Sequence, residues 1–183
     1  MFLGEENVKI NLNGIAKVLV LSTAAVLILL APSTGLAQTD YVSFKSVSGS
    51  YIAHSNGLCN LEQITAKSDK LLKKDASFKV VPALDGSDGW SFESVTLPGN
   101  YLRHENGRLK LGKFENDEGF KKDASFRTSA ALTGAGDAVS LESVNFPGYY
   151  VRSDNGELVL EKSDGSAEFK TDATFKMVAA LSR

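Results

Sequence analysis

One pattern of about fifty residues occurs three times along the chain, and this repetition restricts the possible folds more than any other feature. Each copy opens with a block of alternating apolar and polar residues and continues with a tyrosine, an Asn-Gly pair and a block that begins with aspartate. The first blocks lie at 42–47, 90–95 and 139–144, at offsets of 48 and 49 residues; the tyrosines are at 51, 101 and 150, the Asn-Gly pairs begin at 56, 106 and 155, and the aspartate blocks begin at 75, 123 and 172. The copies are therefore 41–89, 90–138 and 139–183.

Each copy predicts four short strands. The alternation in the first block is the period of a strand with one buried face. The second and third strands flank the Asn-Gly pair, which favours a tight hairpin because both residues tolerate positive φ. A polar loop with room for one helical turn precedes the fourth strand, as in 112–122, and Gly-Asp segments at 85–89 and 133–137 turn the chain into the next copy.

Three units of four strands are compatible with a propeller or with a closed barrel that carries a cap of hairpins. A propeller usually needs at least four blades. We therefore predict an all-β domain, a β-trefoil with three pseudo-symmetric repeats of about 48 residues, in which all units share one core and closure limits exposed strand edges.

The N-terminal segment is predicted to direct export. Its apolar stretch at 18–31 has fourteen residues, fewer than the ~20 needed to cross a bilayer as a helix, and small residues follow it up to Ala37. We interpret 1–37 as a signal peptide cleaved after Ala37, with an uncleaved membrane anchor as the alternative. The mature domain 38–183 is then secreted, or at the cell surface or in the periplasm, without stable insertion into the membrane.

Composition excludes several classes of protein. The formal net charge is −2 and no basic stripe is present, so we expect no nucleic-acid partner. The single cysteine, Cys59, excludes an internal disulfide framework, and because it aligns with Leu109 and Leu158 we predict that it is a small buried hydrophobic residue.

Three motifs carry a resemblance to a known family. They are Ser-Phe-Glu-Ser-Val at 91–95, Pro-Gly-Asn-Tyr-Leu-Arg-His at 98–104 and Phe-Lys-Lys-Asp-Ala-Ser-Phe at 120–126. The chain resembles the arabinose-binding domain of fungal α-L-arabinofuranosidase B, the family-42 carbohydrate-binding module, over nearly all of 38–183. The resemblance implies a β-trefoil that binds L-arabinofuranose side groups of the hemicelluloses arabinoxylan and arabinan.

The resemblance also implies one sugar-binding pocket in each copy, formed by a histidine after the tyrosine and by the aspartate of the later block. The carried-over pairs are His54 with Asp75, His104 with Asp123, and Ser153 with Asp172, with Arg103, Asn106 and Tyr101 as weaker candidates. The third pair has lost its histidine and the first copy departs from the motif at several positions. We therefore rank the middle pocket first and the third pocket last.

The chemistry of these side chains suits a sugar. An ionised carboxylate only accepts hydrogen bonds and can serve two adjacent hydroxyls, while imidazole adds a donor or an acceptor. Structural roles are the alternative: the aspartates as turn residues, the histidines as half-buried strand residues, the tyrosines as core-edge residues and the asparagines as turn formers.

Three function classes remain open, and a binding module leads. A glycosidase needs two carboxylates across one scissile bond, and no such pair is evident; the resemblance places catalysis in a separate domain.

Two equivalent histidines make a poor metal site, and we expect no cofactor. The expected partners are an arabinofuranose-bearing polysaccharide and a separate glycoside hydrolase, and we expect a monomer. The alternative is a scaffold that binds a protein or another glycan.

Overall fold

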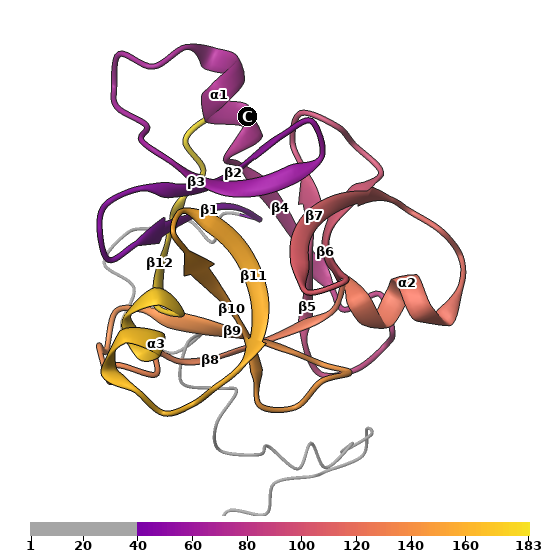
Figure 1. Ribbon diagram of the computed structural model, residues 1–183. Coiled ribbons are helices and arrows are strands. Elements are labelled where there is room, and N and C mark those ends of the chain that lie inside the picture. Colours follow the sequence, from indigo (N-terminus) through magenta and orange to yellow (C-terminus); the bar gives the residue numbers. More distant parts are fainter. Residues whose placement is uncertain (1–39) are drawn as a thin grey trace, which may run out of the picture. The chain divides into compact units, whose positions relative to one another are not determined.

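The computed structural model describes residues 40–183, so the predicted signal peptide or anchor at 1–37 lies outside the described residues. Each sequence copy forms three strands, a short helix and a fourth strand, and all twelve strands are antiparallel to their neighbours (Figure 1). The elements are β1 (Tyr41–Ser46), β2 (Tyr51–Ser55), β3 (Leu58–Glu62), α1 (Lys70–Asp75), β4 (Phe78–Pro82), β5 (Trp90–Ser94), β6 (Asn100–Glu105), β7 (Arg108–Lys113), α2 (Glu118–Asp123), β8 (Phe126–Ala130), β9 (Val139–Ser143), β10 (Tyr149–Asp154), β11 (Glu157–Lys162), α3 (Ala167–Asp172) and β12 (Phe175–Ala179).

The Asn-Gly pairs form the predicted hairpins. Asn56, Asn106 and Asn155 have φ of 50°, 52° and 49°, and the glycine after each also has positive φ. Two consecutive residues with positive φ give the turn whose twist matches that of the flanking strands. The hairpins β2–β3, β6–β7 and β10–β11 are thereby fixed in register.

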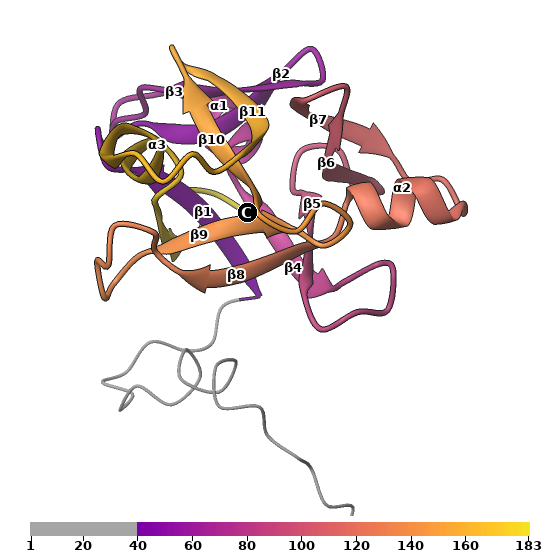
Figure 2. The same ribbon diagram turned by 60° about the horizontal axis from the view of Figure 1, so that its bottom comes forward.

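Each copy has one short helix before its fourth strand. The side chains of Asp69, Asp117 and Ser166 cap the three helices by accepting from the backbone N–H three residues later. The helices lie at three separate positions around the strands (Figures 1 and 2). Each helix ends on the repeated aspartate, so this residue belongs to a helix terminus rather than to the start of the next strand.

The prediction of a β-trefoil was wrong, although the all-β class is correct. The twelve strands form one continuous hydrogen-bonded sheet, in which ten strands close into an antiparallel barrel, instead of a barrel with a separate hairpin cap. The closed ring runs through β9, β10, β11, β3, β7, β6, β5, β4, β1 and β12 and returns to β9.

The hairpins explain this difference, because they bond to one another as well as to their neighbours in sequence. The N–H of a leucine in each hairpin donates to the carbonyl of the turn glycine of another hairpin. These bonds are Leu61 to Gly156 at 2.7 Å, Leu111 to Gly57 at 2.8 Å and Leu160 to Gly107 at 2.8 Å. They tie the three hairpins into the closed sheet.

The core is filled by equivalent residues from the three copies. The fully buried side chains include Phe44, Phe92 and Leu141 from the first strands, Phe78, Phe126 and Phe175 from the fourth strands, and Cys59, Leu109 and Leu158 from the third strands. Burying a side chain of this size contributes about 1.5–3 kcal/mol. Cys59 is buried as predicted, and burial raises the pKa of its thiol to about 12, which keeps it protonated.

No helix within residues 40–183 is long and apolar enough to span a membrane.

Candidate functional site

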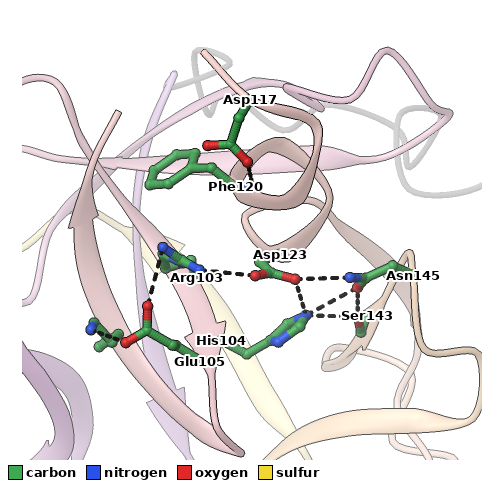
Figure 3. Close-up of polar contacts among 9 residues, drawn as sticks. Arg103, His104, Glu105, Asp117, Phe120, Asp123, Ser143 and Asn145 are labelled. Carbon is green, nitrogen blue, oxygen red and sulfur yellow. Dashed lines mark hydrogen bonds and ion pairs between the residues drawn. The ribbon is translucent and has the colours of Figure 1, made fainter. Parts of the chain in front are cut away.

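The middle copy brings its predicted pair together at one polar cluster. His104 extends from β6 and Asp123 is the last residue of α2, and Nε2 of His104 lies 3.5 Å from Oδ1 of Asp123. The loop between β9 and β10 in the next copy adds Asn145, whose Nδ2 donates to Oδ1 of Asp123 at 2.8 Å (Figure 3). The site is therefore built from two copies of the repeat.

The hydrogen bonds fix the orientation of the imidazole. Because the amide nitrogen of Asn145 faces Asp123, its carbonyl oxygen faces His104, 3.0 Å from Nε2. A carbonyl oxygen only accepts, so Nε2 carries the hydrogen. Ser143 Oγ lies 3.2 Å from the same nitrogen and donates to the Asn145 carbonyl oxygen at 2.7 Å. The imidazole is buried, whereas the side chain of Asp123 is 22% exposed and accessible to a ligand.

Arg103 holds the other side of the Asp123 carboxylate. Its guanidinium donates to Oδ2 at 2.9 Å and lies over the ring of Phe120, 5.0 Å from the ring centroid (Figure 3). Gly112, opposite Tyr101 on β7, leaves room for this arrangement. A Cβ atom at Gly112 would lie 2.6 Å from Cδ of Arg103 and 2.9 Å from the Phe120 ring.

A second carboxylate contacts the same arginine. Oε1 of Glu105 lies 3.4 Å from NH1 of Arg103, and its other oxygen bonds Lys110. The hydrogen bond and charge of Lys110 lower the pKa of Glu105, and Arg103 adds to this effect. Glu105 is therefore ionised at neutral pH.

The first copy also brings its predicted pair together, with fewer polar partners. Nε2 of His54 lies 3.5 Å from Oδ1 of Asp75 and 3.1 Å from Oγ of Ser94, which comes from the next copy. Burial lowers the pKa of His54, and Asp75 opposes that shift in part, so the imidazole is neutral at pH 7. Ala53 replaces the arginine and is buried against Ile64, so no guanidinium holds Asp75.

The third copy does not bring its predicted pair together. Ser153 Oγ accepts from the N–H of Gly156 in its own hairpin. Arg152 donates to Glu161 at 2.7 Å, and its NH1 is 3.8 Å from Asp172. Glu161 occupies the position of Gly112, and it takes the shorter bonds of the arginine, while the ion pair with Asp172 is longer than the 2.9 Å bond of Arg103 to Asp123. Burial raises the pKa of Asp172, and Arg152 counteracts this only in part.

The two remaining weaker candidates lie outside the polar cluster. Asn106 is a turn former with positive φ, as the structural alternative predicted. Tyr101 is half-buried and packs edge-on against Phe114 at 6.1 Å between ring centroids. Burial raises the pKa of Tyr101, with a further contribution from Glu93, so it stays protonated.

The contributions from the next copy were not predicted from the sequence. Asn145, Ser143 and Ser94 follow or end the first strand of that copy, about 40 residues after the histidine they contact. The repeat offset contained the signal, since Ser94 and Ser143 are equivalent positions. Within residues 40–183, no group of three or more His, Cys, Asp and Glu side chains is arranged to hold a metal ion.

The structure thus defines a class of domain: a closed all-β barrel with small His–Asp clusters where the first copy meets the second and where the second meets the third. Within this class the chain belongs to the α-L-arabinofuranosidase B domain family, whose model matches residues 47–138 and 132–183. The match confirms the resemblance that the three motifs indicated.

Curated relatives are fungal enzymes that extend well beyond this domain. The α-L-arabinofuranosidase B of Aspergillus kawachii is 40% identical over 89 residues, and the arabinofuranosidase/B-xylosidase of Trichoderma koningii is 36% identical over 89 residues. Each alignment covers 49% of this chain and 18% of the relative. The chain thus matches a small part of these enzymes.

Solved structures agree with this assignment. An arabinofuranosidase complexed with arabinofuranosyl-α-1,2-xylobiose is similar with a TM-score of 0.72 and 31% identity, over 81% of this chain and 33% of that one. The cytolethal distending toxin of Haemophilus ducreyi has a TM-score of 0.60 at 15% identity, over 82% of this chain and 91% of that one, and shares the fold alone.

Proposed function

We propose that this domain binds L-arabinofuranose side groups of arabinoxylan or arabinan and does not cleave them. The observation that carries the proposal is the cluster of His104, Asp123 and Asn145, which presents a partly exposed carboxylate beside an oriented imidazole. Each carboxylate oxygen of Asp123 accepts one hydrogen bond within the protein and has a further lone pair for a ligand hydroxyl. A related arabinofuranosidase has been solved with an arabinofuranosyl ligand, which supports this choice of sugar.

Binding without cleavage is favoured by the charges at the middle site. A glycosidase keeps one carboxyl group protonated as its general acid by raising its pKa. Here Asp123 and Glu105 both contact the cation of Arg103, and the pKa of Glu105 is lowered. A lowered pKa at Glu105 is the opposite of what a general acid needs, and a carboxylate suits the binding of hydroxyls.

The sites are proposed to differ in strength. The middle site has the most complete set of partners, the first site keeps its histidine and aspartate, and the third site has lost the histidine and keeps only a longer contact between its arginine and its aspartate, at 3.8 Å. Each site is small and solvated and should bind weakly, because ligand hydroxyls exchange one set of hydrogen bonds for another. Two such sites on one domain gain affinity on a branched polymer by avidity.

The proposal includes a location and a partner. The apolar stretch at 18–31 supports export of the domain, and a separate glycoside hydrolase is the expected partner on the polysaccharide.

Calorimetric titration of the full chain with methyl α-L-arabinofuranoside and with arabinoxylan oligosaccharides tests the proposal. The double variant His104→Ala, Asp123→Ala should lose most of the heat. The double variant Ser153→Ala, Asp172→Ala makes equivalent changes at the third site and should retain the heat, which makes it the matched control. Absence of saturable heat in the wild type, or release of arabinose from the oligosaccharides, would contradict the proposal.

A further inference from the structure

A cleft of about 550 Å³ lies where the last sequence copy meets the first. It is bordered by the turn between β1 and β2, by the loop between β8 and β9, and by residues of α3 and β12. Ser46 and Ser48, the equivalents of Ser143 and Asn145, line it whereas Ser153 and Asp172 do not, so the cleft adjoins the third polar site without including its aspartate. Its volume is in the range of sites for small organic ligands.

The cleft coincides with a deletion in the repeat. Four residues separate Ser46 from its following tyrosine, whereas six separate Ser94 and Ser143 from theirs. The two longer loops carry Leu97 and Phe146, which are 45% and 46% exposed and have no counterpart in the first copy. The shorter turn leaves this junction with less covering material than the other two.

The charge of the cleft also departs from the repeat. At the other two junctions the equivalent strand pairs join residues of opposite charge, Lys79 with Glu93 and Arg127 with Glu142. At this junction Lys45 faces Lys176 across β1 and β12. Like charges on directly opposed strand residues are unfavourable, so the replacement of glutamate by Lys45 is not explained by folding.

The glutamates at the other junctions have a structural role that Lys45 lacks. Glu93 accepts from the N–H of Gly99 at 2.8 Å and Glu142 accepts from that of Gly148 at 2.7 Å, so each fastens its long loop. Lys45 replaces this acceptor where the loop is short. The shortening of the loop and the reversal of charge at Lys45 therefore occur together at one junction.

Only one of the two lysines of the cleft is paired with a carboxylate. Lys176 Nζ pairs with Oδ2 of Asp137 at 2.6 Å. Lys45 has no carboxylate within 4.0 Å among residues 40–183, and its Nζ lies over the ring of Tyr51, 5.6 Å from the centroid. The lining thus carries two lysines against one aspartate and leaves one positive charge available to a ligand.

We propose that this cleft binds a uronic acid, through an ion pair between the sugar carboxylate and Lys45. The lining includes Ser48, Thr133 and Thr171 beside the apolar residues Val47 and Ala135, and each of the three hydroxyls, although hydrogen-bonded within the protein, keeps a lone pair for a ligand. This mixture matches a pyranose, which has hydroxyls at its edge and C–H groups on its faces, and a single free ammonium matches a single carboxylate. The site goes beyond the proposed arabinofuranose function and does not depend on it.

Titration of the full chain with methyl β-D-glucuronide tests this inference, with methyl β-D-glucoside and acetate as comparison ligands. We expect saturable binding of the glucuronide with one site per chain, and binding of the glucoside and of acetate at least tenfold weaker. Amide shifts in NMR spectra should concentrate at 45–49 and 133–138. Equal affinity for the glucoside would show that the carboxylate is not recognised, and equal affinity for acetate would show that no sugar is recognised; either result overturns the proposal.

Two substitutions at Lys45 locate the site. Lys45→Glu restores the residue type of the other copies and should lower the affinity for the glucuronide tenfold or more, and Lys45→Gln should lower it severalfold without reversing the charge. Lys67→Glu, on an exposed loop outside the cleft, changes the net charge by the same amount as Lys45→Glu and should leave the affinity within twofold of wild type. If Lys45→Glu and Lys67→Glu have the same effect, the proposal is wrong. Arabinofuranoside binding, measured on the same samples, separates failure of this inference from failure of the proposed function.

Discussion

The middle and third sites have the same strands, the same short helix and the same arginine and aspartate, yet only the middle site assembles. Both arginines lie over the phenylalanine of their helix, but with Gly112 on the neighbouring strand Arg103 bonds Asp123 at 2.9 Å, whereas Arg152 bonds Glu161 at the equivalent position and is 3.8 Å from Asp172. The residue on the neighbouring strand therefore decides which carboxylate makes the short bond to the arginine. The comparison teaches that a repeat can keep its fold and most of its site residues and still lose the site.

The largest effect is expected when the middle site is given the residue of the third. Gly112→Glu places a side chain where Arg103 and Phe120 now lie, within 2.9 Å of both. Overpacking of this kind costs about 1–3 kcal/mol, and the new carboxylate should also draw Arg103 away from Asp123. We expect a lower denaturation midpoint and at least a tenfold loss of arabinofuranoside affinity. Retained affinity would show that the Arg103–Asp123 bond does not matter for binding.

The next effect tests the contribution of the following copy. Asn145→Ala removes the donor to Asp123 and the acceptor that faces His104. Loss of a hydrogen-bond partner in a partly buried cluster costs about 1 kcal/mol or more. Affinity at the middle site should fall about five- to tenfold, measured by calorimetry. Thr96→Ala, at the equivalent position beside the first site, should leave the middle site unchanged and serves as the matched control.

A smaller gain is expected when the third site is given the residues of the middle one. The double variant Ser153→His, Glu161→Gly restores the imidazole and releases Arg152 toward Asp172. The loop that would supply an equivalent of Asn145 is two residues shorter here, so the new site should be weak. NMR titration with the arabinofuranoside should show new shifts near Asp172. Unchanged spectra would mean that the short loop alone prevents binding.

The smallest effect concerns Asp172 in the wild-type third site. Because its pKa is raised in the folded state, the folded protein binds more protons than the unfolded chain between that pKa and the ordinary value, and this group's contribution to stability rises as the pH falls through that window. Asp172→Asn should therefore stabilise the protein at pH 7 by no more than about 0.5 kcal/mol, and the gain should vanish near pH 3. Urea denaturation at both pH values measures it. Destabilisation at pH 7 would indicate that the contact with Arg152 outweighs burial.

Much of the fold could be predicted because the repeated residues act locally. The Asn-Gly pairs specify the hairpins through φ, and the alternation of apolar residues specifies which face of each strand is buried. The continuous closed sheet could not be predicted, because bonds such as that from Leu61 to Gly156 join backbone atoms far apart in sequence. Backbone atoms carry no residue-specific signal for such pairing.

The site was predictable in the same uneven way. The family motif paired His104 with Asp123, which lie 3.5 Å apart, and their role in sugar binding stays a prediction; the position of Asn145 in the next copy was missed. Only one of the two reasons why the third pair does not assemble could be predicted from the sequence. The loss of histidine at Ser153 could be read from the sequence, but the effect of Glu161 on Arg152 depends on which residues face each other across β10 and β11.

The cyclic bonding of the three hairpins has a consequence for how the chain can be connected. Each hairpin donates to one neighbour and accepts from the other, so the ring of bonds has no first or last member. β1 and β12, the first and last strands in the chain, are also paired directly, through Val42 to Ser46 and Phe175 to Ala179. A circularly permuted protein, opened within 85–89 and joined by a linker between the present ends of 40–183, should therefore rebuild the same barrel. The fold would then not depend on which of the three copies comes first in the chain.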